Sequence, residues 1–279
     1  MNIDHDLENA GFPPAGQVFP LAAHALVVHD GDHPWVLENQ AAIEENWARE
    51  VAANPALFNG RMVFQRRLSL VDGRIEGEAY LAPFATFLHW RRLARPAGGY
   101  HLFALPLPIS SDGALIAIRM GAHTANPGRV YCAAGSMDEN DVVSGRCDLD
   151  FNMRREVLEE TGFDIATARA DAQTYAVQSD NTVTVFRRFF FDLTAQEMLD
   201  RIAAHVAADP EPEIDGALAI RDSDRAAHDY PAFMPPCSPG CSTGKDDHVP
   251  RLRHLRRLHR QRAERQSARR RLRRLGPFR

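Results

Sequence analysis

The clearest pattern of apolar and polar positions in the chain lies in its second half. Apolar residues recur there every four positions, the spacing of a buried stripe on an α-helix: Leu149, Met153 and Val157. Asp148 is a favourable N-cap residue, and Gly162 is a favourable residue just past a helix C-terminus. The pattern therefore predicts a helix of about three turns, with the intervening Arg and Glu residues on its other faces.

In the first part of the chain, the pattern predicts a small α+β domain. The expected strands are 17–30, Met62–Leu70 and Arg74–Tyr80, and the expected helices are 38–53 and Leu81–Leu93. Asn59-Gly60 is typical of a hairpin turn. Pro96-Ala97-Gly98-Gly99 is the best candidate for a domain boundary. We therefore expect an N-terminal α+β domain over residues 1–97, whose role the sequence does not reveal.

After this boundary, strand patterns dominate. The expected elements are strands His101–Leu107, Ala114–Met120, Gln173–Gln178, Val183–Leu193 and Gly216–Ile220, and a helix from Thr194 to Ala208. This order indicates an α/β domain over residues 98–236, in which a mixed sheet carries a helix on each face.

Composition limits the class of protein. With 279 residues and 44% hydrophobic content, the chain can bury a substantial core. It has no run of eighteen apolar residues, and its acidic N-terminus lacks the features of a signal peptide, so we expect a cytoplasmic protein without a membrane span. The four cysteines are scattered, so we expect free thiols rather than disulfides or a zinc site.

Charge is distributed very unevenly. Residues 251–279 contain thirteen Arg and one acid, whereas the first 250 residues carry 20 bases and 36 acids, a net charge of −16. The composition changes abruptly after Pro236, and basic residues are almost all Arg, which is typical of a GC-rich gene. We therefore favour a shifted reading frame over residues 237–279. The alternative is a genuine disordered arm that binds nucleic acid.

The predicted helix 149–161 carries the candidate chemistry. Glu156, Glu159 and Glu160 lie at positions i, i+3 and i+4, so the three carboxylates share one face and repel each other. A divalent cation would remove this repulsion, and carboxylate oxygens are ligands that Mg²⁺ prefers. A solvated acidic face is the alternative for such a cluster taken alone.

The wider sequence resembles a known family. Residues Arg155–Phe163 match the second half of the Nudix box, R-E-U-x-E-E-x-G-U, where U is aliphatic or aromatic, and Tyr131–Asp138 resembles the strand and glycine loop that open the box. The first half departs from the pattern. Gly135 lies twenty rather than fourteen residues before Arg155, and the family's first glutamate falls on Cys147. The resemblance to Nudix hydrolases covers about residues 100–236.

The resemblance implies a Nudix-like α/β/α sandwich and a hydrolase that cleaves the pyrophosphate of a nucleoside diphosphate linked to another moiety. ADP-ribose and nucleotide sugars are the substrate types we expect. The implied cofactor is Mg²⁺ (or Mn²⁺), held by Glu156, Glu159, Glu160 and the backbone carbonyl of Gly135. Catalysis is expected to depend on Glu160, Glu159 and Arg155, with the arginine positioning a glutamate rather than binding substrate.

Several alternatives stay open from the sequence. The general base is Glu160 itself or an acid of the later Glu211-Pro212-Glu213 segment, which is otherwise an exposed acidic loop. Tyr131, Tyr175 and Phe186 are candidates for base recognition or simply core residues. A catalytically silent Nudix-like nucleotide-binding module is the rival function. The expected partner is a small-molecule nucleotide, with nucleic acid only if the Arg-rich tail is genuine, and a homodimer is left open.

Overall fold

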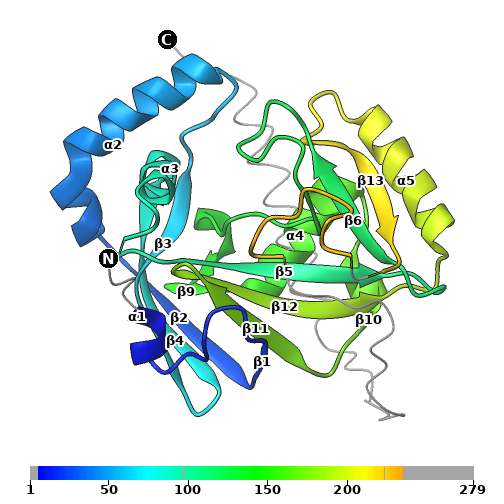
Figure 1. The fold of residues 1–279 in the computed structure, drawn as a ribbon, viewed down its shortest axis with the longest axis horizontal. Helices are drawn as coiled ribbons and strands as arrows, with labels where there is room; N and C mark the ends of the chain where they lie inside the picture. Colours follow the sequence, from blue (N-terminus) through cyan, green and yellow to red (C-terminus); the bar gives the residue numbers. More distant parts are fainter. Residues whose placement is uncertain (1–5, 97, 223, 235–279) are drawn as a thin grey trace. The chain divides into compact units, whose positions relative to one another are not determined.

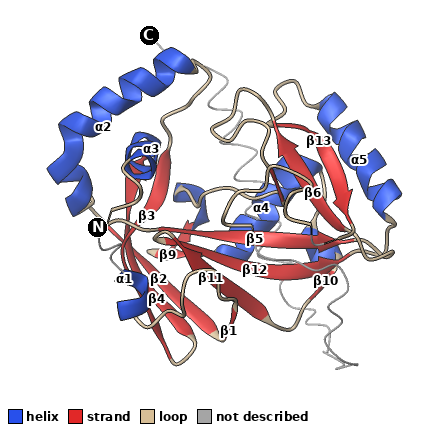
Figure 2. Ribbon diagram, viewed as in Figure 1, coloured by secondary structure: helices blue, strands red, loops and turns tan. Residues whose placement is uncertain are grey.

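The structure, a computed structural model, describes residues 6–96, 98–222 and 224–234, whose strands form two mixed sheets flanked by helices (Figures 1 and 2). The first sheet has the order β1-β11-β12-β5-β6-β13, with β10 beside β12 and β7 beside β6. Among the described residues, β12 and β5 are its only parallel pair. Its strands are β1 (Phe19–Leu21), β5 (His101–Ile109), β6 (Leu115–Met120), β7 (Val130–Tyr131), β10 (Arg169–Ala170), β11 (Thr174–Ser179), β12 (Thr182–Phe190) and β13 (Ile214–Ile220). The predicted α/β class with a mixed sheet is confirmed.

The second sheet has the order β3-β4-β2-β9-β8 among the described residues. Its strands are β2 (Ala23–His29), β3 (Arg61–Val71), β4 (Arg74–Pro83), β8 (Val142–Val143) and β9 (Arg146–Cys147). The last two come from the lengthened box loop, and the N–H of Val28 donates to the carbonyl of Gly145 at 2.8 Å. The extra residues therefore form a hairpin that extends the sheet of the N-terminal segment.

The helices are α1 (Asp6–Asn9), α2 (Pro34–Ala53), α3 (Phe84–Arg92), α4 (Leu149–Thr161) and α5 (Ala195–Ala208), with 3₁₀ turns at Glu139–Asp141 and Ile165–Thr167. The helix predicted from the Leu/Met/Val stripe is α4. Asp148 caps it by accepting a hydrogen bond from the N–H of Phe151, and Gly162 ends it with φ at 77°, a conformation that favours glycine.

Helices α4 and α5 contact each other. Val157 of α4 and Met198 of α5 line one small apolar cavity together with Ile116 and Ile118 of β6. The opposite side of β5 is covered differently, because Phe233 packs edge-on against Phe103 at a centroid distance of 5.0 Å. The C-terminal described segment thus covers the side of the sheet that the helices leave free.

Two local predictions were wrong. The single strand expected over 17–30 divides at Ala22, because β1 pairs with β11 of the first sheet while β2 pairs with β4 of the second. Asn59-Gly60 is not a hairpin turn. The side chain of Asn59 instead accepts a hydrogen bond from the N–H of Ala85, at the start of α3. Both errors arise from tertiary contacts that local patterns do not encode.

The N-terminal segment and the rest of the described chain share both sheets. The N–H of Val63 in β3 donates to the carbonyl of Met137 at 2.8 Å, and Gln65 and Tyr100 exchange backbone hydrogen bonds. The proposed boundary near residue 97 stays a prediction, but strand β3 directly supports the glycine loop at Gly135. The Arg-rich segment 237–279 lies outside the described residues.

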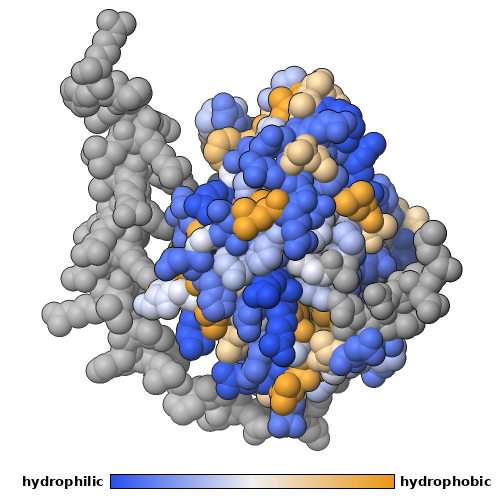
Figure 3. Space-filling model, turned by 90° about the vertical axis from the view of Figure 1, so that its left-hand side faces the viewer, coloured by the Kyte–Doolittle hydropathy of each residue, from blue (hydrophilic) through white to orange (hydrophobic). Residues whose placement is uncertain are grey.

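The face of the described chain drawn in Figure 3 shows no extended apolar band. The face in Figure 3 carries apolar residues scattered among polar ones, and the most exposed large apolar side chains are far apart in sequence: Leu37, Phe58, Val71, Leu93 and Leu158. No helix within the described ranges has the length and apolar character needed to cross a membrane. Cys132 and Cys147 are buried and form no disulfide within the described ranges, whereas Cys237 and Cys241 fall outside those ranges.

Candidate active site

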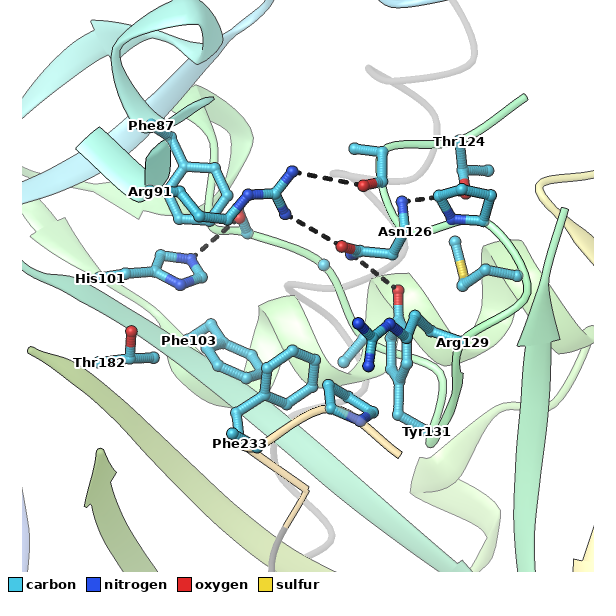
Figure 4. Close-up of a pocket in the computed structure, with 18 of the residues that line it drawn as sticks. Phe87, Arg91, His101, Phe103, Thr124, Asn126, Arg129, Tyr131, Thr182 and Phe233 are labelled. Atoms are coloured by element: carbon cyan, nitrogen blue, oxygen red, sulfur yellow. Dashed lines mark hydrogen bonds between the residues drawn. The ribbon is translucent and has the colours of Figure 1, made fainter. Parts of the chain in front are cut away.

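A pocket of about 930 Å³ opens between α3, α4 and strands of the first sheet, among them β5 and β12, a size suited to a small organic ligand (Figure 4). Carboxylates line one end: Glu156, Glu160 and Glu213. Aromatic and cationic side chains line the other end: Phe87, Arg91, Arg95, His101, Phe103, Arg129, Tyr131 and Phe233. We refer to these as the carboxylate end and the arginine end of the pocket.

The carboxylate end is built mainly from α4. Glu160 is only 9% exposed and accepts a hydrogen bond from the backbone N–H of Ala134. Its Oε2 atom is buried and has no hydrogen-bond partner among the described residues. A buried carboxylate oxygen without a partner carries a large desolvation cost, which a bound cation would offset.

Burial and like charge act together on the two glutamates of α4. Burial, followed by the neighbouring carboxylates Glu156 and Glu213, raises the pKa of Glu160 well above its ordinary value. Burial also raises the pKa of Glu156 to about 8, although the Arg155 charge opposes this shift. The protein alone therefore disfavours two ionised carboxylates at this place, and a divalent cation would favour them.

Gly135 lies directly against the carboxylate of Glu156. A Cβ atom at this position would be 2.6 Å from the Glu156 carboxylate atoms, so no larger residue fits without displacing that side chain. The close approach places the glycine backbone beside the carboxylates. An oxygen-rich set of this kind suits a hard divalent cation. Within the described ranges, however, no three His, Cys, Asp or Glu side chains are already arranged around a common metal position, so backbone and water oxygens would have to complete the set.

Arg155 is the centre of a network of acids. It donates from Nε and Nη2 to the two carboxylate oxygens of Asp141, at 3.2 and 2.8 Å. Its Nη2 also lies 2.7 Å from Glu156 Oε1, and its Nη1 lies 3.1 Å from Glu159 Oε2. Burial opposes the charge of Arg155, but the hydrogen bonds to Asp141 and the charge of Glu156 raise its pKa.

Asp141 is the partner that the sequence did not reveal. It is fully buried and also accepts hydrogen bonds from the side chain of Asn152 and the backbone N–H of Asp138. It belongs to the lengthened loop, six residues before Cys147, the position of the family's first glutamate. Cys147 itself is buried in β9, and burial raises the pKa of its thiol to about 12. The loop thus supplies an acid to Arg155 from a different position.

The other acidic residues that the sequence suggested as site residues lie in different places in the structure. Glu213 lines the pocket, whereas Glu211 is exposed and outside it. The Glu159 side chain is 40% exposed, and its carboxylate is on Arg155 rather than in the pocket lining.

The three aromatic candidates for base recognition also lie in different places. Tyr131 lines the pocket, and its hydroxyl accepts a hydrogen bond from the side chain of Asn126 at 3.4 Å. Tyr175 and Phe186 stack on each other on β11 and β12, away from the pocket.

The arginine end comes from segments that are distant in sequence. Helix α3 contributes Phe87 and Arg91, strand β5 contributes His101, and the C-terminal described segment contributes Phe233 (Figure 4). Burial, followed by the charges of Arg91 and Arg95, lowers the pKa of His101 to about 3, so its ring is neutral. Its Nε2 lies 3.0 Å from the Ser136 hydroxyl, next to Gly135. No local sequence pattern indicated this wall.

Comparisons with known proteins give weak likenesses only. No protein-family model and no curated protein matches the chain. Among solved structures, the protein DR0079 from Deinococcus radiodurans is 16% identical, with 37% of this chain and 73% of that chain covered and a TM-score of 0.26. A MutT protein from Methanosarcina mazei Go1 is 16% identical, with 48% and 86% covered and a TM-score of 0.31. Likenesses this weak do not identify the protein, so the function has to be inferred from the site.

Proposed function

We propose that the protein is a metal-dependent hydrolase that cleaves the pyrophosphate of a nucleoside diphosphate linked to another group. The observation that carries this proposal is the buried pair Glu156 and Glu160, which faces a pocket beside Gly135 and leaves Glu160 Oε2 without a partner among the described residues. Ionising both carboxylates has a high free-energy cost without a cation, and the pair is well suited to bind one. The resemblance of Arg155–Phe163 to the Nudix box supports the same chemistry.

In this proposal Glu156, Glu160 and the carbonyl of Gly135 hold Mg²⁺ or Mn²⁺, with Glu159 completing the acidic cluster at the rim. When bound, the ion would neutralise phosphate oxygens and lower the pKa of a coordinated water. Arg155 holds Glu156 and Glu159 in place and is a positioning residue, because its guanidinium is occupied by Asp141 and by these two acids.

We assign proton acceptance to Glu213. It lines the pocket and contributes to the electrostatic environment of both Glu156 and Glu160. It is also exposed, so it can pass a proton to solvent after it has taken one from the attacking water. Glu160 is less suited to this role because its carboxylate is committed to the buried cluster.

The test is hydrolysis of a panel of nucleoside diphosphate derivatives, including ADP-ribose and nucleotide sugars, with Mg²⁺ or Mn²⁺. We expect release of a nucleoside monophosphate from at least one, and no release with chelator or in Glu160→Gln. Binding of a panel member without turnover would instead identify a catalytically silent nucleotide-binding module. Neither binding nor turnover with any member would contradict both functions.

A further inference from the structure

Arg91 at the arginine end of the pocket is a cation whose described hydrogen-bond partners are all neutral. It is half-buried on α3, and its Nη1 donates to Asn126 Oδ1 at 3.0 Å and its Nη2 to the carbonyl of Ala125 at 3.4 Å. Within the described ranges, no carboxylate is hydrogen-bonded or ion-paired to it. A guanidinium carries five N–H donors, so Arg91 retains donors for a ligand.

The neighbouring arginines of the pocket differ from Arg91 in this respect. Arg95 is ion-paired with Asp180 at 3.1 Å, and Arg129 is ion-paired with Asp229 at 2.8 Å. Burial is the main cause that lowers the pKa of Arg91. The charge of Glu50 opposes this shift, and the charges of Arg95 and Arg129 add to it to a smaller extent. A buried cation among other cations is stabilised most by an anion that arrives with a ligand.

The same end of the pocket carries an aromatic wall. Phe87 lies 5.4 Å below the Arg91 guanidinium and 4.6 Å from the ring of His101. The series continues through Phe103, 5.0 Å from His101, and Phe233, 5.0 Å from Phe103. Aromatic faces beside an arginine provide stacking surface for a planar ring and charge for a phosphate on the same molecule (Figure 4).

We propose that Arg91 binds one phosphate of the substrate, different from the phosphates that lie at the carboxylate end. This inference rests on the proposed function, and it narrows the substrate to a nucleotide with a phosphate beyond the cleaved linkage. That phosphate belongs either to the nucleoside ribose or to the far end of the 5′ phosphate chain. The N-terminal segment, through α3, would then select the substrate.

The first experiment uses inorganic phosphate as the probe, in chelator and at constant ionic strength. Without metal the carboxylate end holds no ion that could bind phosphate, so binding measured by calorimetry reports on the arginine end. We expect binding to the wild type, binding about 10- to 100-fold weaker in Arg91→Gln, and partial retention in Arg91→Lys. Arg92→Gln is the matched control, because Arg92 is an exposed residue of the same helix outside the pocket lining.

Two results would overturn the inference. One is equal phosphate affinity in the wild type and in a folded Arg91→Gln variant. The other is a full loss of phosphate binding in Asn126→Ala, which keeps the guanidinium but removes its side-chain partner in the loop. That loss would mean that Arg91 only anchors the loop. Because no metal and no turnover are involved, a failure here is distinguishable from a failure of the proposed hydrolase activity.

A second experiment separates the two sources of the phosphate. In the Glu160→Gln background with Mg²⁺, adenosine 3′,5′-bisphosphate and adenosine 5′-triphosphate are compared for binding with and without Arg91→Gln. If Arg91→Gln weakens binding of the bisphosphate alone, Arg91 binds a ribose phosphate. If it weakens binding of the triphosphate alone, Arg91 binds the far end of the 5′ phosphate chain. Unchanged affinity for both nucleotides would contradict the proposal.

Discussion

The two ends of the pocket are assembled in opposite ways. The carboxylate end takes Glu156 and Glu160 from consecutive turns of one helix and places them beside the loop of Gly135. The arginine end combines Phe87 and Arg91 of α3 with residues of β5, of the 123–129 loop and of the 229–234 segment.

This difference explains why only the carboxylate end could be predicted from the sequence. Helical spacing guarantees that Glu156 and Glu160 lie on one face, whatever the rest of the fold does. No spacing rule connects Arg91 with Asn126 or Phe233, which line one pocket only in the tertiary structure. A local cluster can be inferred from periodicity, whereas a wall made of distant segments requires the tertiary structure.

The largest expected effect is that of Glu160→Gln. The change removes the most deeply buried carboxylate of the proposed metal site, so turnover should fall by about 1,000-fold or more. Stability without metal should stay equal or rise, because the carboxylate repulsion is relieved. Turnover on the active substrate and urea unfolding measure these two quantities.

Glu159→Gln is the matched control for that experiment. The Glu159 side chain is 40% exposed, and its carboxylate is ion-paired with Arg155. The loss of turnover should therefore be smaller than for Glu160→Gln. Near-wild-type turnover in both variants would show that the carboxylates carry no metal.

The fold predictions succeeded where the chain's own pattern decides the structure. Helix α4, with its caps at Asp148 and Gly162, and helix α5, with the capping box of Thr194 and Glu197, lie close to their predicted ranges. The β3–β4 hairpin, which turns at Asp72-Gly73, contains the two predicted strands Met62–Leu70 and Arg74–Tyr80. These features depend on neighbours within a few residues, which a sequence displays directly.

The missed features depend on partners far away in sequence. In the sequence, the loop Glu139–Cys147 is a departure from the spacing of the Nudix box that Arg155–Phe163 resembles. In the structure, this loop supplies Asp141, which accepts hydrogen bonds from Arg155, and its strand β9 pairs with β2. Likewise, Ala22 divides one apolar run into strands of two sheets. No periodicity within either segment specifies such a partner.

Arg155→Ala should have the next largest effect, on stability as well as on activity. It leaves the fully buried Asp141 without its cation, so the free energy of unfolding should fall by about 3–5 kcal/mol. Turnover should also fall, because Glu156 and Glu159 lose their anchor. Asp141→Asn is the complementary variant, since it keeps the arginine and removes the buried charge. A loss of substrate affinity alone, with unchanged unfolding and turnover, would make Arg155 a substrate ligand.

The pH dependence of stability should distinguish the carboxylate end. Glu156 has a folded pKa of about 8, above its unfolded value, so the folded state binds more protons than the unfolded state up to that pH. His33 and His101 act oppositely, since burial lowers their pKa values to about 4 and about 3, but their effect ends near the ordinary histidine value. Between about pH 6.5 and pH 8, the free energy of unfolding should therefore decrease in chelator.

Urea unfolding across that interval checks this expectation. Glu156→Gln should flatten the decrease, and Mg²⁺ should reverse it because the ion favours the deprotonated carboxylates. The same slope in the wild type and in Glu156→Gln would contradict the assignment to this residue.

The smallest expected effect concerns Tyr131 of the arginine end. Its hydroxyl accepts a hydrogen bond from Asn126, the residue that also accepts from Arg91. At 3.4 Å this bond is long, and the ring packs against Phe233 at 5.3 Å independently of the hydroxyl. Tyr131→Phe should therefore change the free energy of unfolding by about 1 kcal/mol or less, and turnover by only a few-fold. Kinetics with the active substrate measure the difference. A loss of turnover of more than about tenfold, 1.4 kcal/mol in transition-state stabilisation, would mean that the hydroxyl touches the substrate and that the two ends act through it.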